Sequence, residues 1–198
     1  EQKMERRYLA TCAGGLEQHL ADEITTTLAL GTVLGVPKGK VMFESSHPPA
    51  SVRELLTADD IYAYAGTVKG VPRGKEEGLD FIHDIAMEMD WSGPLETFEA
   101  WTGIPATSPS AASTLTIRGT VERRSEEMEK HQFNSCEAAG SLGSGFLDQR
   151  GWGVSMKNFD VEVCGWVLDD SIVLALALVP AHPHPTMKGA GGERSKGA

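Results

Sequence analysis

The sequence contains few cysteines, few aromatic residues and no long hydrophobic run. Its three cysteines, Cys12, Cys136 and Cys164, lie far apart and form no CxxC pair, which argues against a disulfide framework or a cysteine-based zinc site. The longest apolar run, residues 172–179, is much shorter than the roughly 20 residues of a membrane-spanning helix, and residues 1–7 precede no signal-peptide core. We therefore expect a chain of a reducing compartment with no membrane partner, in the cytoplasm, with the nucleus as the alternative.

The sequence also lacks the positive charge of proteins that grip nucleic acid by bulk electrostatics. Eighteen Lys and Arg residues stand against 28 Asp and Glu residues, which gives a formal net charge of -10. The first 110 residues carry 17 of the acidic and 9 of the basic side chains, so the second part is close to neutral. A nucleic-acid-binding surface would therefore have to be a local cationic patch, and we do not expect DNA as a partner.

The first part of the chain has the pattern of a ferredoxin-like domain. Apolar residues recur every four positions from Leu16 to Leu28, directly after a Gly14-Gly15 turn, which indicates an amphipathic helix. The predicted elements are a strand at 8–12, this helix, a hairpin at 32–36 and 40–44, a short helix after Pro48-Pro49, and a strand at 61–71. The order βαββαβ predicts a four-stranded antiparallel sheet covered on one face by two helices, which we assign to residues 1–75.

The second part begins with an amphipathic helix at 76–90 and a structureless loop at 103–113. Asn134 and Glu137 have the spacing of a capping box, which predicts the start of a helix that runs to about residue 149. Further strands are predicted at 115–121, 160–168 and 172–179, and the nearly unbroken apolar run of the last one indicates a central position. Residues 180–198 show no periodicity and are predicted to be a disordered tail.

Several segments resemble a known family. WSGPL at 91–95, HQFNSCEAA at 131–139 and KNFDVEV at 157–163 are similar to the THUMP domain of THUMP-containing tRNA guanine-N2-methyltransferases. Residues 11–23 and GKVMF at 39–43 resemble the ferredoxin-like domain that precedes THUMP in that family. The resemblance implies an α+β fold, with a ferredoxin-like domain at 1–75, a connecting helix and a THUMP α/β domain at 76–179, and the tail at 180–198.

The resemblance also implies a function. The two domains of the family together hold the acceptor stem and the single-stranded 3′ end of tRNA for S-adenosylmethionine-dependent methylation. Some members work with a small zinc-binding activator protein. This sequence shows no glycine-rich cofactor loop and no Asn/Asp-Pro-Pro-aromatic motif. We therefore expect a tRNA-binding region that binds no cofactor, has no catalytic residues and is inactive without a separate methyltransferase domain, which is itself an expected partner.

Cationic and planar side chains of the second part are the candidate RNA ligands, because phosphates need cations and unstacked bases need planar or polar groups. Glutamates surround Arg123 and Arg124 in the sequence, so a solvated charged loop is the alternative interpretation for these two residues. No metal site is expected, since His182 and His184 have no third ligand nearby in the sequence. The candidates are Arg118, Arg123, Arg124, Lys130, His131 and Lys157.

Two other classes of function remain open at this point. The acidic first part favours an adaptor or decoy that binds a protein partner without catalysis. A ferredoxin-like architecture is also compatible with a module that senses a metabolite, because one fold serves many functions.

Overall fold

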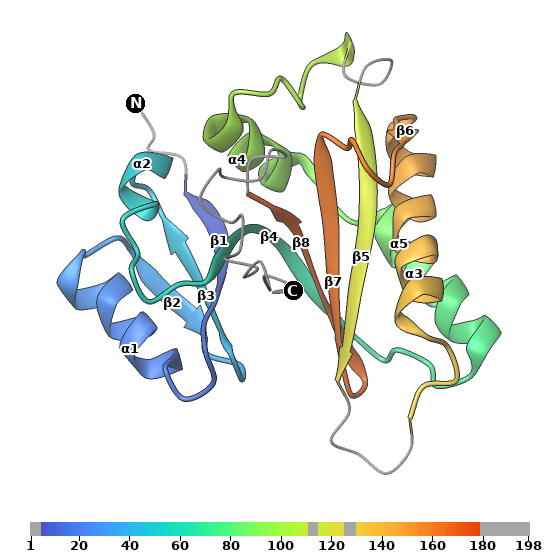
Figure 1. The fold of residues 1–198 in the computed structure, drawn as a ribbon, viewed down its shortest axis with the longest axis horizontal. Helices are drawn as coiled ribbons and strands as arrows, with labels where there is room; N and C mark the ends of the chain where they lie inside the picture. Colours follow the sequence, from blue (N-terminus) through green and yellow to red (C-terminus); the bar gives the residue numbers. More distant parts are fainter. Residues whose placement is uncertain (1–4, 111–114, 125–129, 179–198) are drawn as a thin grey trace, which may run out of the picture.

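The computed structural model describes residues 5–110, 115–124 and 130–178, and it contains one mixed sheet of eight strands with helices packed against it (Figure 1). Its strands are β1 (Arg6–Thr11), β2 (Thr32–Gly35), β3 (Lys40–Ser45), β4 (Asp60–Lys69), β5 (Thr116–Arg124), β6 (Gly153–Val154), β7 (Val161–Leu168) and β8 (Ser171–Ala177). The helices are α1 (Glu17–Asp22), the π-helical η1 (Glu23–Thr27), α2 (Pro49–Val52), α3 (Lys75–Glu88), α4 (Ser92–Thr102) and α5 (Ser135–Arg150).

The strands lie in the order β2-β3-β1-β4-β8-β7-β5-β6. The pairs from β2 to β7 are antiparallel, whereas β5 runs parallel to both β7 and β6. Strand β4 joins the two parts of the chain, since one of its edges pairs with β1 and the other with β8.

The expected fold class, a ferredoxin-like domain followed by a THUMP domain, is wrong. A ferredoxin-like domain followed by a separate THUMP domain would have placed the strands in separate sheets, but β4 continues directly into β8 of a single sheet. Residues 61–71 were expected to be the last strand of a closed unit, because the pairing of residues 62–69 with 171–177 is not visible in local patterns. The boundary at residue 75 stays a prediction, and the expected tail lies outside the described residues.

Most of the individual elements are confirmed. The hairpin of β2 and β3 and the central position of β8 agree with the sequence pattern. Asn134 accepts a hydrogen bond from the Glu137 amide, and the Glu137 carboxylate accepts one from the Asn134 amide, both at 2.9 Å, so the capping box is present. Helix α4 was missed, because Gly93-Pro94 reads as a break although proline is well tolerated in a first helical turn.

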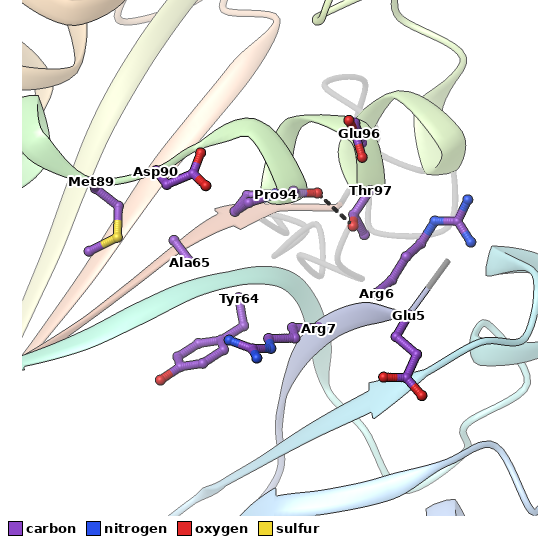
Figure 2. A pocket seen from close by; sticks show the side chains of 11 residues that line it. Glu5, Arg6, Arg7, Tyr64, Ala65, Met89, Asp90, Pro94, Glu96 and Thr97 are labelled. Atoms are coloured by element: carbon purple, nitrogen blue, oxygen red, sulfur yellow. Dashed lines mark hydrogen bonds between the residues drawn. The ribbon is translucent and has the colours of Figure 1, made fainter. Parts of the chain in front are cut away.

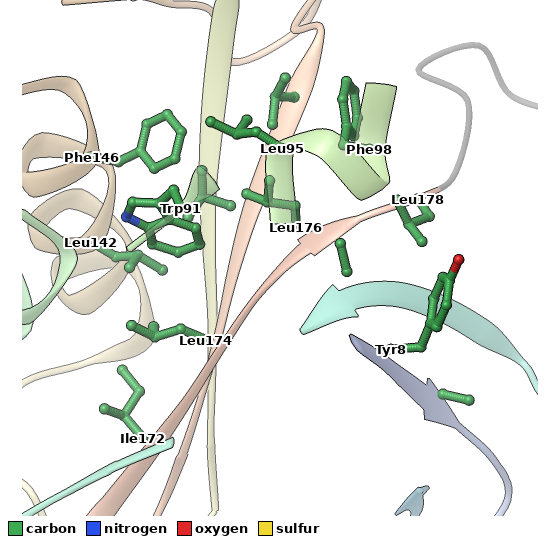
Figure 3. Packing of buried hydrophobic residues seen from close by; sticks show 14 of the residues in the cluster. Tyr8, Trp91, Leu95, Phe98, Leu142, Phe146, Ile172, Leu174, Leu176 and Leu178 are labelled. Atoms are coloured by element: carbon green, nitrogen blue, oxygen red, sulfur yellow. The ribbon is translucent and has the colours of Figure 1, made fainter. Parts of the chain in front are cut away.

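The core lies between the helices and one face of the sheet (Figure 3). Trp91 contacts Phe146 of α5 edge-on, with ring centroids 5.1 Å apart, and its indole N–H donates to the Ala86 carbonyl at 2.9 Å. Leu95 and Phe98 of α4 are buried in the same cluster. The opposite face has a smaller buried cluster, which is formed by strand residues alone.

That second face is curved. Three strands separate β3 from β7, yet the Lys40 ammonium lies 5.3 Å from the centre of the Trp166 ring. Lys40 is 3% exposed, and burial lowers its pKa. Twist therefore brings distant strands together on this face.

Helices α3 and α5 pack closely because a glycine lies where they touch. A Cβ atom at Gly145 would overlap the carbonyl oxygen of His83, whereas one at Gly140 would meet nothing within 4 Å. No helix in the described ranges is long and apolar enough to cross a membrane.

The two glycines predict opposite stability changes in one helix. We expect Gly145→Ala to lower the free energy of unfolding by about 1–3 kcal/mol, because α3 must move away from the added methyl group. Gly140→Ala should raise it by about 0.5–1 kcal/mol, because alanine favours a helix more than glycine does. Urea denaturation measures both. Equal effects of the two substitutions would contradict the packing.

His83 predicts a pH-dependent contribution to stability. Its Nε2 lies 2.8 Å from Asp148 of α5 and its Nδ1 lies 3.1 Å from Asp84, and these hydrogen bonds raise the pKa of His83. The protonated ring is therefore favoured in the folded state, so the stabilisation is complete below the unfolded pKa of about 6.5 and is lost as the pH rises through the folded value.

We expect the stability difference between the unchanged protein and His83→Asn to decrease between pH 6 and pH 8 in urea denaturation. Its size should be that of an exposed ion pair, about 0.2–1 kcal/mol. A difference that does not change with pH would show that His83 acts only through packing.

Candidate nucleic-acid interface

Strand β5 carries three of the predicted RNA ligands, and their side chains point to both faces of the sheet. Side chains alternate along a strand, so Arg118 and Arg124 share one face and Arg123 points to the helix side. Arg123 lies five positions after Arg118, which is about 17 Å along the strand. The predicted ligands therefore form two groups, one at each end of β5.

Arg118 is held in a planar arrangement at the first end. Its Nε and Nη2 donate to Glu162 Oε1 at 3.1 and 2.7 Å, and its guanidinium carbon lies 4.0 Å from the centre of the Phe159 ring. Thr120 donates to the same carboxylate oxygen at 2.5 Å. The Arg118 side chain is 34% exposed and Glu162 only 16%, so the guanidinium keeps an accessible part while its charge is largely balanced.

Lys157 lies at the same end, exposed on the turn before β7. The Thr116 hydroxyl bonds the Asn158 carbonyl at 3.1 Å, and the Thr116 amide bonds Asp160 Oδ2 at 2.8 Å. The Asn158 amide in turn donates to Ser155 Oγ at 3.1 Å. The turn is thus fixed to the start of β5, with Asp160 accepting hydrogen bonds from both the amide and the hydroxyl of Thr116.

His131 belongs to the other end of β5, and it is buried. It is 7% exposed, its ring centroid lies 4.9 Å from that of Phe133, and its carbonyl accepts a hydrogen bond from Arg123 at 3.4 Å. Burial, followed by the charges of Arg73 and Arg123, lowers the pKa of His131. The ring is therefore neutral near pH 7. Sequence reasoning had treated it as a loop residue.

Arg124 and Lys130 complete the second group, and both are exposed. Arg123 differs from them, because its guanidinium lies over the Phe133 ring at 5.6 Å. The accessible cations at this end are thus Arg124 and Lys130, while Arg123 and His131 pack around Phe133 on the helix side.

A groove runs along the edge of β5 next to Arg118. We call this the β5-edge groove; its volume is about 570 Å³. Strand β6 pairs only with Thr116 and Ile117, so the edge of β5 is open beyond them within the described residues. The groove is lined by Arg118, Gly119, Thr120, Val121, Ser135, Cys136, Ala139, Gly140, Gly143, Ser144, Leu147, Val154, Met156 and Glu162.

A second cavity, which sequence reasoning missed, lies where β1 separates from β4 beneath α4 (Figure 2). We call this the sheet-fork pocket; its volume is about 410 Å³. Its lining residues come from the start of β1, from β4, from the end of α3 and from the first turns of α4. They are Glu5, Arg6, Arg7, Tyr64, Ala65, Met89, Asp90, Gly93, Pro94, Glu96 and Thr97.

The fork follows from the strand register. Strand β1 pairs with β3 along its whole length from Arg6, but it pairs with β4 only from Tyr8 onward. Next to the point where the β1–β4 pairing stops, β4 has a bulge, because Ala65 falls between the Tyr64 and Gly66 pairs with β8. Bulges redirect side chains and often lie next to binding sites. The usable sequence signals were the Arg6-Arg7 pair and the glycine inside a strand.

The residues that the structure describes contain no group of three His, Cys, Asp or Glu side chains placed to hold a metal ion. Glu17, at the start of α1, accepts hydrogen bonds from the Gly15 amide of the preceding turn and from the Gly39 amide of the β2–β3 turn, at 2.8 and 2.7 Å.

No protein-family model matches the chain. Over 70 residues, or 35% of the chain, it is 41% identical to tRNA (guanine(6)-N(2))-methyltransferase THUMP3 of Bos taurus, and this match spans 13% of that protein. The Mus musculus protein of the same name is 39% identical over 56 residues, which are 28% of the chain and 11% of that protein. The chain thus matches about one eighth of the length of these curated relatives.

Solved structures resemble a much larger part of the chain. TrmN from Thermus thermophilus has a TM-score of 0.61 and 20% identity, over 90% of this chain and 47% of that one. PH1313 from Pyrococcus horikoshii has a TM-score of 0.51 and 13% identity, over 86% of this chain and 54% of that one. A 4-thiouridine synthetase in complex with RNA has a TM-score of 0.50 and 13% identity, over 87% of this chain and 41% of that one. At these identities the likeness shows the fold alone.

The Arg118–Glu162 pair predicts a stability difference between two cations at the same end of β5. We expect Arg118→Ala to lower the free energy of unfolding by about 1–3 kcal/mol, because a largely buried carboxylate loses its charged partner. Lys157→Ala on the exposed turn should change it by less than about 0.5 kcal/mol. Adding Glu162→Gln to Arg118→Ala should restore part of the loss in thermal or urea unfolding. Equal effects of the two alanine variants would contradict the pairing.

Proposed function

We propose that this chain is the tRNA-holding region of a THUMP-type tRNA guanine-N2-methyltransferase. The single observation that carries the proposal is the sequence similarity to two proteins named as tRNA guanine-N2-methyltransferases. The likeness in fold to TrmN and to a synthetase crystallised with RNA supports it.

The role proposed for the chain is to position the acceptor end of tRNA. Holding a substrate in register lets a separate active site act on one nucleotide, because it removes the entropy of bringing the partners together. Lys130, Lys157 and Arg124 are exposed and suited to phosphates, while the accessible part of Arg118 is suited to a base or a phosphate. Arg123 and His131 would hold the loop that carries Lys130, because Arg123 donates to the His131 carbonyl.

Methylation itself is assigned in this proposal to a catalytic region outside these 198 residues. That region would bind S-adenosylmethionine, and a small zinc-binding activator protein is a candidate partner for it. The chain alone is then expected to bind tRNA without transferring a methyl group. We propose the cytoplasm as the place of action, since tRNA modification by such an enzyme would occur there.

Charge reversal tests the proposed RNA surface. We expect Lys130→Glu together with Lys157→Glu to weaken binding of an unmodified tRNA transcript about tenfold at about 50 mM salt. The slope of log affinity against log salt should become shallower by about 0.7–0.9 for each phosphate that is no longer neutralised. Filter binding measures both quantities.

Lys38→Glu is the matched control, because Lys38 is exposed on the β2–β3 turn, far from β5 in the sheet order. It should leave the affinity within about twofold. Equal weakening by the double variant and by the Lys38→Glu control would rule out β5 as the RNA surface. Failure of the unchanged chain to bind tRNA would refute the function, and a protein partner captured after ribonuclease treatment would then favour an adaptor. Stabilisation by a small metabolite but not by tRNA would favour a sensor.

A further inference from the structure

The β5-edge groove borders on one edge of the β5 backbone. The Ile117 carbonyl accepts a hydrogen bond from the Ser155 amide, just after β6, at 3.0 Å, whereas the Thr116 carbonyl accepts one from the Asp160 amide, just before β7, at 2.9 Å. Backbone groups of successive strand residues point to opposite sides of the strand. The odd-numbered residues of β5 therefore direct their amide and carbonyl groups away from β7.

Beyond Ile117 this outward edge is open. The β5–β7 register continues without a shift to Arg124, so Gly119, Val121 and Arg123 keep the outward orientation. Within the described ranges, β6 pairs only with the first two residues of β5, and no other strand lies on this side. Gly119 and Val121 line the groove, although glycine has no side chain and Val121 is only 5% exposed. What they present to the groove is therefore their backbone.

Helix α5 lies beside β5 and forms one wall of the groove (Figure 1). The helix is in direct contact with the strand, because a Cβ atom at Gly119 would overlap the Ala139 carbonyl oxygen. The residues that α5 presents to the groove are mostly small, and a Cβ atom at Gly140 would meet nothing within 4 Å. Val154 and Met156 also line the groove and are 64% and 67% exposed. Space for large side chains thus adjoins two apolar side chains that are left in contact with water.

The other wall belongs to the opposite face of the sheet. Arg118, Thr120 and Glu162 line the groove from the face that carries no helix. A compact ligand could not contact both walls, because the edge of β5 lies between them. An added strand could, since its alternate side chains point to opposite faces while its backbone pairs with β5. The groove therefore has the form of a site for an extended polypeptide.

Charge selects the kind of polypeptide. Lys157 follows Met156 in the chain, is exposed, and forms no ion pair with a residue that the structure describes. Glu162 balances Arg118, so the end of the groove near Lys157 keeps an excess of positive charge. The chain as a whole has a net charge of -10, which disfavours acidic partners at most other surfaces. A carboxylate of an extended partner would thus be favoured at this end.

We propose that the β5-edge groove binds an extended segment of another protein, which adds to β5 as a strand. The segment is about seven residues long, to match the roughly 20 Å of residues 118–124. It carries aliphatic side chains at alternate positions toward α5 and a carboxylate next to Lys157. Strand addition takes its affinity from main-chain hydrogen bonds and its specificity from pockets for alternate side chains. The inference goes beyond the proposed function, because it requires no RNA.

Hydrogen exchange with a designed peptide tests the site. The probe is acetyl-Asp-Val-Ser-Val-Ser-Val-Asp-amide, with a carboxylate at each end so that either strand direction is allowed. Acetyl-Asp-Ser-Val-Val-Val-Ser-Asp-amide has the same composition without the alternation and is the control. At about 1 mM, which reveals even weak association, we expect the probe to slow exchange of the Gly119, Val121 and Arg123 amides. The control peptide should slow it much less.

Cys136 provides a second measurement. It lines the groove and is exposed, whereas Cys12 and Cys164 are buried, so iodoacetamide should label mainly Cys136. We expect the probe to slow this labelling. Ser144→Leu, which fills the groove, should weaken probe binding about tenfold or more, the equivalent of one buried aliphatic side chain. Ser144→Ala leaves the groove open and should bind the probe like the unchanged protein.

Lys157→Gln tests the charge. It should weaken binding of the probe about 1.5- to 5-fold, as expected for an exposed ion pair. It should not affect an analogue in which Asn replaces both Asp residues of the probe. Circular dichroism confirms that each variant is folded.

Three results would overturn the inference. One is unchanged exchange of the Gly119 and Val121 amides with the probe, or equal effects of the two peptides. Another is Cys136 labelling that slows with protein concentration alone, which would make a second copy of this chain the occupant. The third is protection of these amides by tRNA but not by the probe, which would assign the groove to RNA and leave the proposed function standing.

Discussion

Strand β4 pairs with two other strands, and the rest of the structure depends on this double pairing. Its ten residues form a long ladder with β8, while β1 uses only the first part of its other edge. The remaining length of β4 is what leaves room for α4 over the fork. Because β4 belongs to both parts of the chain, the core, the curvature and the sheet-fork pocket are set by the same hydrogen-bond register.

The charge distribution must reconcile an acidic composition with the anionic ligand of the proposed function. The net charge is -10, yet Arg118 is balanced locally by Glu162, and Lys130 and Lys157 are exposed at opposite ends of β5. Charges within about one Debye length, roughly 8–10 Å, dominate what a phosphate senses. The acidic residues of the first part would therefore affect the encounter with the proposed RNA ligand more than its contact with β5.

Local elements were predictable from the sequence, and their assembly was not. The capping box at Asn134 and the hairpin of β2 and β3 depend on residues close together in the chain, so spacing alone revealed them. The pairing of β4 with β8 joins residues that are far apart in the chain, such as Tyr62 and Ala177, and no periodicity encodes such a partner.

In the candidate site, too, local features were predictable and long-range contacts were not. The strand that contains Arg118 was predicted, but the pairing of Arg118 with Glu162 depends on the β5–β7 register. His131 lies in a polar stretch of sequence, yet Phe133 and Arg123 enclose it in the folded chain. The Arg6-Arg7 pair became informative only once a fork was seen beside it.

The order of synthesis gives the β4–β8 pairing a further meaning. As the chain leaves the ribosome, β1 to β4 are available long before β8, so one edge of β4 has no partner during that time. Unpaired edges promote association between chains, and pairing of distant segments slows folding. The nascent protein would therefore be most dependent on chaperones in the interval between the appearance of Lys69 and that of Ala177.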